Sequence, residues 1–302
     1  MAGGRVLVTG SEGFTGQYVC RELSQAGWEV YRAGLTAKPD DPRYLCVDLL
    51  DPSSLLPIAD LRVDVVIHLA AMAFVAEQDP APFYQVNLLG TRHLLETLAA
   101  AKHPPACTII ASSANIYGNT TAGAISEKVP PNPANDYAVS KLAMEYLVRT
   151  YMNRLGIVIT RPFNYTGVGQ NPRFLIPKIV THFVARQPEI ELGNLNVERE
   201  FSDVRDIAQL YRLLAEKQPV GETLNLCSGQ PVSLHACIEL AQEITGHVIT
   251  VKVNPDFVRA NEVKTLSGNR SKLTTLLQPS PPRQFRETLG WMLSTTQANG
   301  DM

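Results

Sequence analysis

The stretch "RVLVTGSEGFTG", residues 5–16, decides the fold. Its first six residues form a short apolar run that is typical of a buried strand, and residues 14–26 have the spacing of an amphipathic helix. Between them, Gly10, Gly13 and Gly16 form a GxxGxxG pattern. Glycines let the backbone turn tightly and approach a pyrophosphate, whose charge is met by the helix N-terminus. The stretch therefore predicts a dinucleotide-binding unit, the alternative being a tight loop without a ligand.

The same alternation continues along the chain. Helical patterns at residues 83–102 and 136–154 fall between short runs rich in Val and Ile. Such runs, with helices between them, indicate strands of a parallel sheet covered on both faces. We therefore predict an α/β fold with a Rossmann-type doubly wound parallel sheet. Its further strands are expected at residues 29–34, 43–49, 63–70, 107–112 and 156–162.

After about residue 163 the pattern loosens. Helices are predicted at 174–187, at 206–217 with Asp206 as N-cap, and at 233–246. We expect a cofactor-binding lobe over residues 1–163, to which later segments near 195–225 return. Residues 164–302 would mainly form a smaller C-terminal α/β lobe that binds the substrate, in a cleft between the two lobes.

Composition excludes several classes of protein. The chain has 302 residues and a formal net charge of −2, which argues against broad nucleic-acid binding. Its five cysteines are odd in number and form no CxxC pair, so neither a disulfide framework nor a metal site is predicted. No signal-peptide pattern is present, and no apolar stretch reaches the roughly 20 residues of a membrane span. We expect a cytoplasmic protein without a membrane partner.

The residues at the end of the second predicted strand indicate which nicotinamide cofactor the protein uses. NAD sites usually carry an acidic residue there, which holds the ribose hydroxyls. The sequence instead reads "VYRAGLT", with Arg32 and no acid. This favours NADPH, with NADH as the alternative cofactor and a solvated loop position as the alternative for Arg32. Asp48, after the third strand, is a candidate acceptor for an adenine amine, or else a helix cap.

Ser113, Tyr137 and Lys141 form the candidate catalytic set. Tyr137 and Lys141 are four residues apart, on one face of a predicted helix. A nearby ammonium stabilises a phenolate and lowers the phenol pKa from about 10, so that the phenol can exchange a proton with a substrate oxygen. Ser113 follows the fifth strand, at the ligand edge of the sheet, where its hydroxyl can hydrogen-bond the reacting oxygen.

Taken in order, "TGSEGFTG", "HLAA" (68–71), "SSANIYG" (112–118), "YAVSK" (137–141) and "RPFN" (161–164) resemble the extended short-chain dehydrogenases/reductases. The resemblance covers nearly the whole chain. It implies a nucleotide-sugar substrate and a homodimer through the helices near 83–102 and 136–154, although an apolar stripe there could equally face only the core. The cofactor contacts that it implies are Gly10, Gly13, Phe14, Thr15, Gly16, Arg32, Asp48, Leu49, Leu69, Ala70, Ala71, Tyr137, Lys141 and Pro162.

Three later stretches, at 167–179, 192–206 and 257–273, resemble the GDP-mannose 4,6-dehydratases and their reductase relatives. That resemblance implies a GDP-sugar. Its diphosphate and sugar would be held by Asn164, Arg199 and Arg259, its guanine or ribose by Glu262, and a phosphate by Lys178. Guanidinium groups match a diphosphate bidentately, while the alternative for each arginine is a surface salt bridge, and for Lys178 a solvated helix position.

Asn115 separates the reactions that this group performs. Dehydratases of the group carry a glutamate two positions after the catalytic hydroxyl, where this chain has Asn115. An amide cannot relay the proton that elimination requires. With Asn115 among the substrate-binding residues, we expect reduction of the C4 ketone of GDP-4-keto-6-deoxy-D-mannose to GDP-D-rhamnose. The alternatives are a 4,6-dehydratase with another base, a nucleotide-sugar 4-epimerase with tightly held NAD, and a nicotinamide-sensing regulatory protein.

Overall fold

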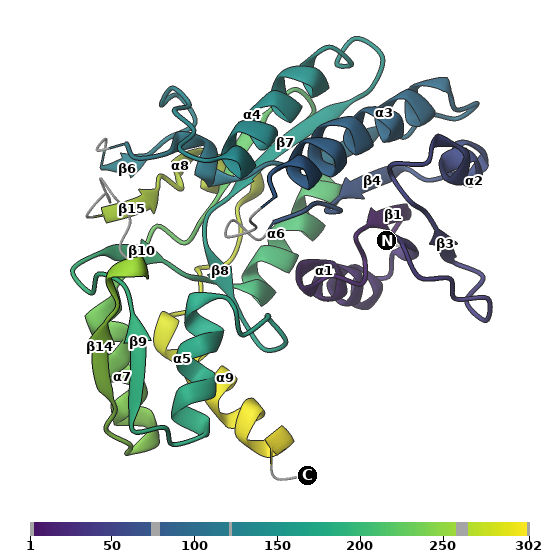
Figure 1. The fold of residues 1–302 in the computed structure, drawn as a ribbon. Coiled ribbons are helices and arrows are strands. Elements are labelled where there is room, and N and C mark those ends of the chain that lie inside the picture. Colours follow the sequence, from purple (N-terminus) through teal and green to yellow (C-terminus); the bar gives the residue numbers. More distant parts are fainter. Residues whose placement is uncertain (1–2, 74–78, 121–122, 258–264, 301–302) are drawn as a thin grey trace.

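Seven parallel strands form the central sheet of the computed structural model, which describes residues 3–73, 79–120, 123–257 and 265–300 (Figure 1). The strand order is β12-β7-β5-β4-β1-β2-β3, and each neighbouring pair is parallel. This arrangement confirms the predicted doubly wound Rossmann-type sheet. The strands are β1 (Arg5–Thr9), β2 (Glu29–Gly34), β3 (Tyr44–Cys46), β4 (Val65–His68), β5 (Cys107–Ala111), β7 (Ile157–Pro162) and β12 (Thr223–Leu226).

The strand order reverses at β1. From β1 the chain builds outward to β2 and β3 on one side, and then to β4, β5, β7 and β12 on the other. Connections therefore leave the carboxyl ends of β1 and β4 in opposite directions, and the crevice this creates is where doubly wound sheets bind ligands.

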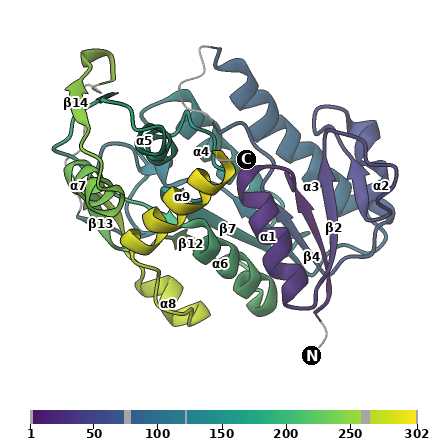
Figure 2. The ribbon, with the colours of Figure 1, turned by 90° about the horizontal axis from the view of Figure 1, so that it is seen from below.

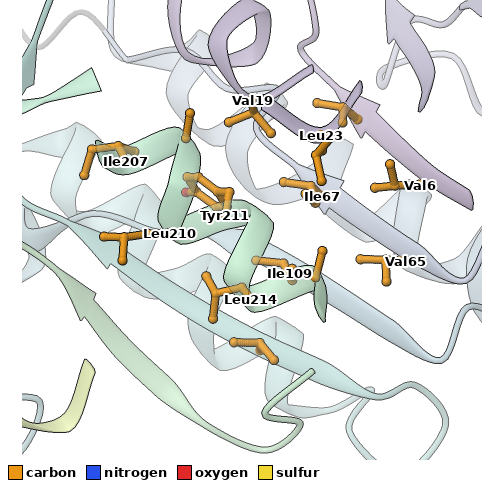
Figure 3. Packing of buried hydrophobic residues seen from close by; sticks show 14 of the residues in the cluster. Val6, Val19, Leu23, Val65, Ile67, Ile109, Ile207, Leu210, Tyr211 and Leu214 are labelled. Atoms are coloured by element: carbon orange, nitrogen blue, oxygen red, sulfur yellow. The ribbon is translucent and has the colours of Figure 1, made fainter. Parts of the chain in front are cut away.

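Helices cover both faces of this sheet. One face carries α1 (Phe14–Gln25), α6 (Val204–Lys217) and α8 (Ser271–Leu277), and α1 and α6 lie side by side (Figure 2). Between them and the strands, Val19 and Leu23 of α1 and Tyr211 of α6 pack over Ile67 and Ile109 (Figure 3). The opposite face of the sheet is covered by α2 (Leu56–Asp60), α3 (Thr91–Ala100) and α4 (Asp136–Arg149).

A second apolar core lies beyond the sheet, at the lower left of Figure 1. It is built from α5 (Leu175–Val184), α7 (Leu234–Thr245), α9 (Phe285–Gly300) and the parallel pair β9 (Glu189–Leu192) and β14 (Thr250–Val253). A small sheet has the order β13-β10-β15-β6. Its strands are β13 (Pro231–Ser233), β10 (Glu198–Glu200), β15 (Thr265–Gly268) and β6 (Ala124–Ile125). The remaining elements are the parallel pair β8 (Tyr165–Thr166) and β11 (Ser202–Asp203) and the short 3-10 helices η1 (Pro52–Leu55), η3 (Ala114–Tyr117) and η4 (Pro255–Phe257).

Several helix boundaries differ from the sequence prediction, among them that of α5, which ends at Val184 and not at 187. Helix α6 begins at Val204, because Asp203 has extended backbone and its carboxylate accepts from the Arg205 N–H at 2.8 Å. Asp206 is therefore not the N-cap, and its carboxylate accepts from the Arg283 N–H at 2.7 Å. The helix predicted at 83–102 is a π-helix, η2 (Phe83–Gly90), followed by α3, and the one predicted at 136–154 ends at Arg149.

Among the described residues, no helix combines the length and the apolar character needed to cross a membrane.

Candidate active site

Tyr137 and Lys141 lie in the first two turns of α4. The Asn135 side chain caps the helix by accepting from the Ala138 N–H at 2.9 Å. Both side chains are buried, with exposed fractions of 8% for Tyr137 and 3% for Lys141. The Lys141 ammonium donates to the Ala111 carbonyl at 2.8 Å, which ties α4 to the carboxyl end of β5. The two residues thus meet the sheet at its ligand edge.

Ser113 and Asn115 stand directly after β5. Ser113 caps the short helix η3, and its hydroxyl accepts from the Asn115 N–H at 3.1 Å. The Ser113 side chain also acts on the Tyr137 phenol, whose pKa it lowers. The Asn115 side chain is half-buried and has no hydrogen-bond partner in the described part of the chain. The structure therefore brings Ser113, Asn115, Tyr137 and Lys141 together.

The protonation of this set differs from the simple expectation. Burial raises the pKa of Tyr137 to about 12, although the hydrogen bond from Ser113 acts in the opposite direction. The Lys141 ammonium, meanwhile, is hydrogen-bonded to the Ala111 carbonyl. Burial also lowers the pKa of Lys141 to about 8, opposed by the nearby Glu145 carboxylate. Tyr137 is consequently a neutral phenol at neutral pH.

Glu145 continues the face of α4 that carries Tyr137 and Lys141, and no sequence pattern singles it out. It forms a buried ion pair with Arg161 of β7. Arg161 also donates to the Tyr117 hydroxyl at 2.9 Å, and Tyr117 donates to the Asn225 side chain at 2.8 Å. This network joins α4, η3, β7 and β12 beneath the site.

The glycine loop is built by close backbone contacts. Gly10 has φ +68°, and a Cβ there would lie 2.7 Å from the Ala70 nitrogen. A Cβ on Gly16 would lie 2.2 Å from the Gly10 carbonyl oxygen. Gly13 is the N-cap of α1 and has no side chain to cover the first turn. Glycine at position 10 lets the loop pass beside Leu69 and Ala70, and glycine at position 16 lets α1 start close to the Gly10 backbone, at the crevice between β1 and β4.

A buried polar chain supports this loop. Both ring nitrogens of His68 are hydrogen-bonded, one to the Thr9 hydroxyl at 2.7 Å and the other to the Thr91 hydroxyl at 3.0 Å. Burial, and secondarily the Lys141 charge, lower the His68 pKa to about 3, so the ring is neutral. His68 therefore has a structural role here, holding the ends of β1 and β4 against η2 and α3.

Asn87, in the π-helix η2, is a second residue that sequence reasoning missed. Its side chain accepts from the Met72 N–H at 2.9 Å and donates to the Ser140 hydroxyl at 3.0 Å. Ser140 in turn donates to the Tyr137 carbonyl at 2.8 Å. Asn87 thus connects the segment after β4 to the first turn of α4. The wider π-helical turn accompanies this contact, and no local pattern in the sequence would have indicated it.

Tyr165 joins the glycine loop to the candidate catalytic residues. Its hydroxyl lies 2.7 Å from the Thr15 hydroxyl, and its ring stacks on Phe14 with centroids 6.1 Å apart. Tyr165 also contributes to raising the pKa of Tyr137. The predicted cofactor residues Phe14 and Thr15 are thereby placed beside the segment that follows β7, where Pro162 is half-buried and Asn164 is exposed.

The predicted residues around the adenosine end lie along the β2 and β3 edge. Arg32 lines a cavity of about 580 Å³ that begins at Ser11 of the glycine loop, and it forms an ion pair with Asp41. Asp48 is exposed after β3 and accepts from the Leu50 N–H at 2.9 Å, so it forms a local turn and is not a helix cap. Leu49 is buried, and its carbonyl accepts from the His93 ring at 2.8 Å.

The residues predicted to contact the substrate lie on several separate elements, unlike the candidate catalytic residues. Lys178 in α5 donates to the Glu191 carbonyl at 2.8 Å and lies over the Phe257 ring, with its ammonium 4.8 Å from the ring centroid. Arg199 in β10 donates to the Glu198 carbonyl at 2.8 Å. Arg259 and Glu262 lie outside the described residues. Within those residues, no group of three or more His, Cys, Asp or Glu side chains is arranged to hold a metal ion.

Comparison with known proteins agrees with this geometry. A model of the NAD dependent epimerase/dehydratase family matches residues 6–227. The GDP-6-deoxy-D-talose 4-dehydrogenase of Aggregatibacter actinomycetemcomitans is 36% identical over 277 residues, covering 90% of this chain and 91% of that protein. The GDP-6-deoxy-D-mannose reductase of Pseudomonas aeruginosa is 33% identical over 304 residues, covering 96% of each. The structure of RMD from Pseudomonas aeruginosa complexed with NADPH has a TM-score of 0.87 and 30% identity, with 98% of both chains covered.

Proposed function

The chain belongs to the NAD dependent epimerase/dehydratase family, and we propose that it is a 4-ketoreductase of a GDP-sugar. Its substrate would be GDP-4-keto-6-deoxy-D-mannose and its product GDP-D-rhamnose. The observation that carries this proposal is a neutral amide, Asn115, beside a complete set of Ser113, Tyr137 and Lys141. The set suits reduction of a ketone, and the amide removes the acid or base that elimination would use.

Each residue of the set has a distinct task. A bound nicotinamide cofactor supplies the hydride that reduces C4. Tyr137 donates its phenolic proton to O4, and Ser113 hydrogen-bonds the same oxygen. Lys141 provides positive charge beneath the phenol, between β5 and α4. Burial keeps Tyr137 protonated at neutral pH. Reduction of a ketone needs a protonated phenol as its proton donor, whereas oxidation of an alcohol needs a deprotonated one as its base.

We propose NADPH as the cofactor, with NADH as the alternative. The tight glycine loop at the N-terminus of α1 supports a pyrophosphate site, because Cβ atoms at Gly10 and Gly16 would collide with the surrounding backbone. The adjoining cavity contains Arg21, Arg32 and Arg43, which suits a 2′-phosphate better than a free ribose hydroxyl. The related RMD was solved with NADPH, which supports the same choice.

The proposal that the nucleotide of the substrate is GDP rests on the relatives, two of which are named for GDP-sugars. For the diphosphate and sugar we propose Asn164 and Arg199, together with Arg259 and, for the nucleoside, Glu262. Lys178 is the weakest of the proposed contacts, because its ammonium is already engaged by the Glu191 carbonyl.

A second candidate product is GDP-6-deoxy-D-talose, which differs from GDP-D-rhamnose only in configuration at C4. The relative named as a GDP-6-deoxy-D-talose 4-dehydrogenase favours it. The configuration depends on which face of the ketone is presented to the cofactor, while the tasks of Ser113, Tyr137 and Lys141 are the same for both products.

One experiment distinguishes these functions. The purified protein is incubated with GDP-4-keto-6-deoxy-D-mannose and NADPH or NADH, cofactor oxidation is followed at 340 nm, and the product is identified by NMR. We expect oxidation of NADPH and formation of GDP-D-rhamnose, and a talose product would select the second candidate. Build-up of the 4-keto sugar from GDP-mannose would instead establish a dehydratase, and interconversion of sugars without net cofactor oxidation a 4-epimerase.

We also propose a homodimer through η2, α3 and α4. Three large side chains on these elements are exposed in the single chain: Leu89 at 45%, Val139 at 38% and Tyr146 at 60%. Burial of such groups against a second copy is the simplest use of this face. Analytical ultracentrifugation should give a dimer for the natural protein and a monomer for the Leu89→Glu, Tyr146→Glu double variant; a monomer for both would refute the interface.

A further inference from the structure

The cavity beside the glycine loop contains one feature that its proposed ligand does not explain. Three guanidinium groups, those of Arg21, Arg32 and Arg43, line it, and they suit an anion. A single carboxylate, that of Asp41, lines it as well and forms an ion pair with Arg32. An acid in a pocket for a phosphate opposes the ligand's charge, so its placement calls for a reason.

We propose that Asp41 is a specificity-determining residue for the cofactor: its carboxylate competes with the 2′-phosphate of NADP(H) for Arg32. The inference rests on the proposed function, in which this cavity holds the adenosine end of the cofactor. Asp41 then sets how strongly the site prefers a cofactor with a 2′-phosphate to one with a free 2′-hydroxyl. Only a ligand that carries the phosphate must displace the carboxylate.

The backbone around Asp41 holds its carboxylate in place. One carboxylate oxygen accepts from the Arg43 N–H at 3.1 Å, and the other accepts a hydrogen bond from the Arg32 guanidinium. The Asp41 N–H donates to the Lys38 carbonyl at 3.0 Å, and its own carbonyl accepts from the Tyr44 N–H at 3.0 Å. Because the turn is fixed from both sides, the carboxylate stays near Arg32 when the arginine engages another anion.

The ion pair is weak enough for a phosphate to displace it. The Arg32 and Asp41 side chains are 42% and 23% exposed, and partly exposed pairs of this kind gain little from their attraction. A 2′-phosphate carries more charge than a carboxylate and offers more acceptor oxygens to a guanidinium. Displacement therefore succeeds, but the nearby carboxylate weakens the binding of the phosphate. A 2′-hydroxyl meets no such competition.

The test measures binding of two fragments, adenosine 2′,5′-diphosphate and 5′-AMP, by isothermal titration calorimetry at physiological ionic strength. The key variant is Asp41→Asn, which removes the charge but keeps an oxygen that can accept from the Arg43 N–H. We expect it to bind the diphosphate about fivefold more tightly than the natural protein, and 5′-AMP with unchanged affinity. With intact cofactors, the ratio of kcat/KM for NADPH to that for NADH should rise by a similar factor.

Two controls isolate the competition for Arg32. Asp40→Asn removes the same charge from the next position, which is exposed and does not line the cavity, so it should change neither affinity. In the background of Arg32→Ala, Asp41→Asn should no longer strengthen binding of the diphosphate, because the group competed for is gone.

The outcomes separate this inference from the function on which it rests. If the natural protein binds the diphosphate no better than 5′-AMP, the cavity is not a 2′-phosphate site, and both the NADPH proposal and this inference fail. If it prefers the diphosphate but Asp41→Asn binds it no more tightly, only the role of Asp41 is overturned. An equal gain with and without Arg32 would also overturn it, because the effect would then be general electrostatics.

Discussion

Glu145 and Arg161 form a bidentate ion pair in the interior of the protein, with nitrogen–oxygen distances of 2.9 and 2.7 Å. Their side chains are 0% and 4% exposed. The pair joins α4 to β7 eight residues after Tyr137, so the position of the helix that carries Tyr137 and Lys141 depends on it. A buried ion pair of this kind adds little to the stability of the folded state compared with a pair of apolar residues in the same place. Removal of one partner alone, however, leaves an uncompensated buried charge, which is strongly destabilising.

Glu145→Gln should therefore destabilise the protein by about 3–5 kcal/mol. It should also lower the pKa of Lys141 further below about 8, because the Glu145 carboxylate favours the charged ammonium. Thermal unfolding measures the first effect, and the pH dependence of kcat the second. Glu96→Gln breaks an exposed pair with Arg92 and should change neither quantity; equal effects in the two variants would contradict the role of the buried pair.

Tyr137→Phe should reduce kcat by at least about 100-fold, because it removes the proton donor to O4. The midpoint of thermal unfolding should change little, since the ring still packs edge-on against Phe83. Tyr146→Phe, on an exposed position of the same helix, is the matched control and should retain full activity. Near-natural kcat in Tyr137→Phe would remove Tyr137 from the mechanism.

Glu200, in β10, should make stability fall as the pH rises. One of its carboxylate oxygens accepts from the Gly229 N–H at 2.9 Å, while the other is buried and has no partner among the described residues. Burial raises its pKa from 4.5 to about 7, so the folded state keeps a proton that the unfolded chain releases. The stabilisation from this proton is complete below pH 4.5 and is lost by about pH 7, with a magnitude on the order of 3 kcal/mol.

Glu200→Gln removes this titration while keeping the shape of the side chain. The variant should match the natural protein at pH 4.5 and be the more stable of the two at pH 8, as measured by chemical denaturation at both values. Glu198→Gln, two residues away and half-buried in the same strand, controls for the loss of a carboxylate at this edge. A constant difference between Glu200→Gln and the natural protein at all pH values would show that Glu200 does not titrate as argued.

Asn115→Glu should introduce a slow elimination activity. The glutamate would stand two residues after Ser113, in the half-buried space where the amide has no described partner. Given GDP-mannose and NADP⁺, the variant should form detectable 4-keto-6-deoxy sugar, while the natural protein and Asn115→Gln form none. Formation of this product by all three proteins would show that Asn115 does not separate the two reactions.

The sequence predicted the sheet and the proximity of Ser113, Tyr137 and Lys141 because both depend on local order. The glycine loop must follow β1, and Tyr137 and Lys141 must be one helical turn apart. Helix boundaries were less predictable, since Asp203 and Asp206 are both acceptable caps and only the backbone at Asp203 decides between them.

The residues that were missed act across long separations in the chain. Tyr165 meets Thr15 across 150 positions, and Asn87 reaches Ser140 across 53. No spacing rule connects such pairs, because the packing of whole elements brings them together. Glu145 was missed for a different reason: an acid on a helix usually faces solvent, and its burial follows only from the presence of Arg161 in the adjacent strand.

The position of β12 at the end of the central sheet constrains how the protein is made. This strand comes from residues 223–226, after α5 and β9 of the second apolar core, and it pairs with β7. During synthesis, the edge of β7 that pairs with β12 therefore stays unpaired until more than sixty further residues have left the ribosome. Its Ile157, Val158 and Ile159, all 0% exposed in the finished fold, would form an aggregation-prone edge in the nascent chain. A fragment that stops at residue 163 would keep that edge permanently, so the segment 1–163 would not form a complete sheet on its own.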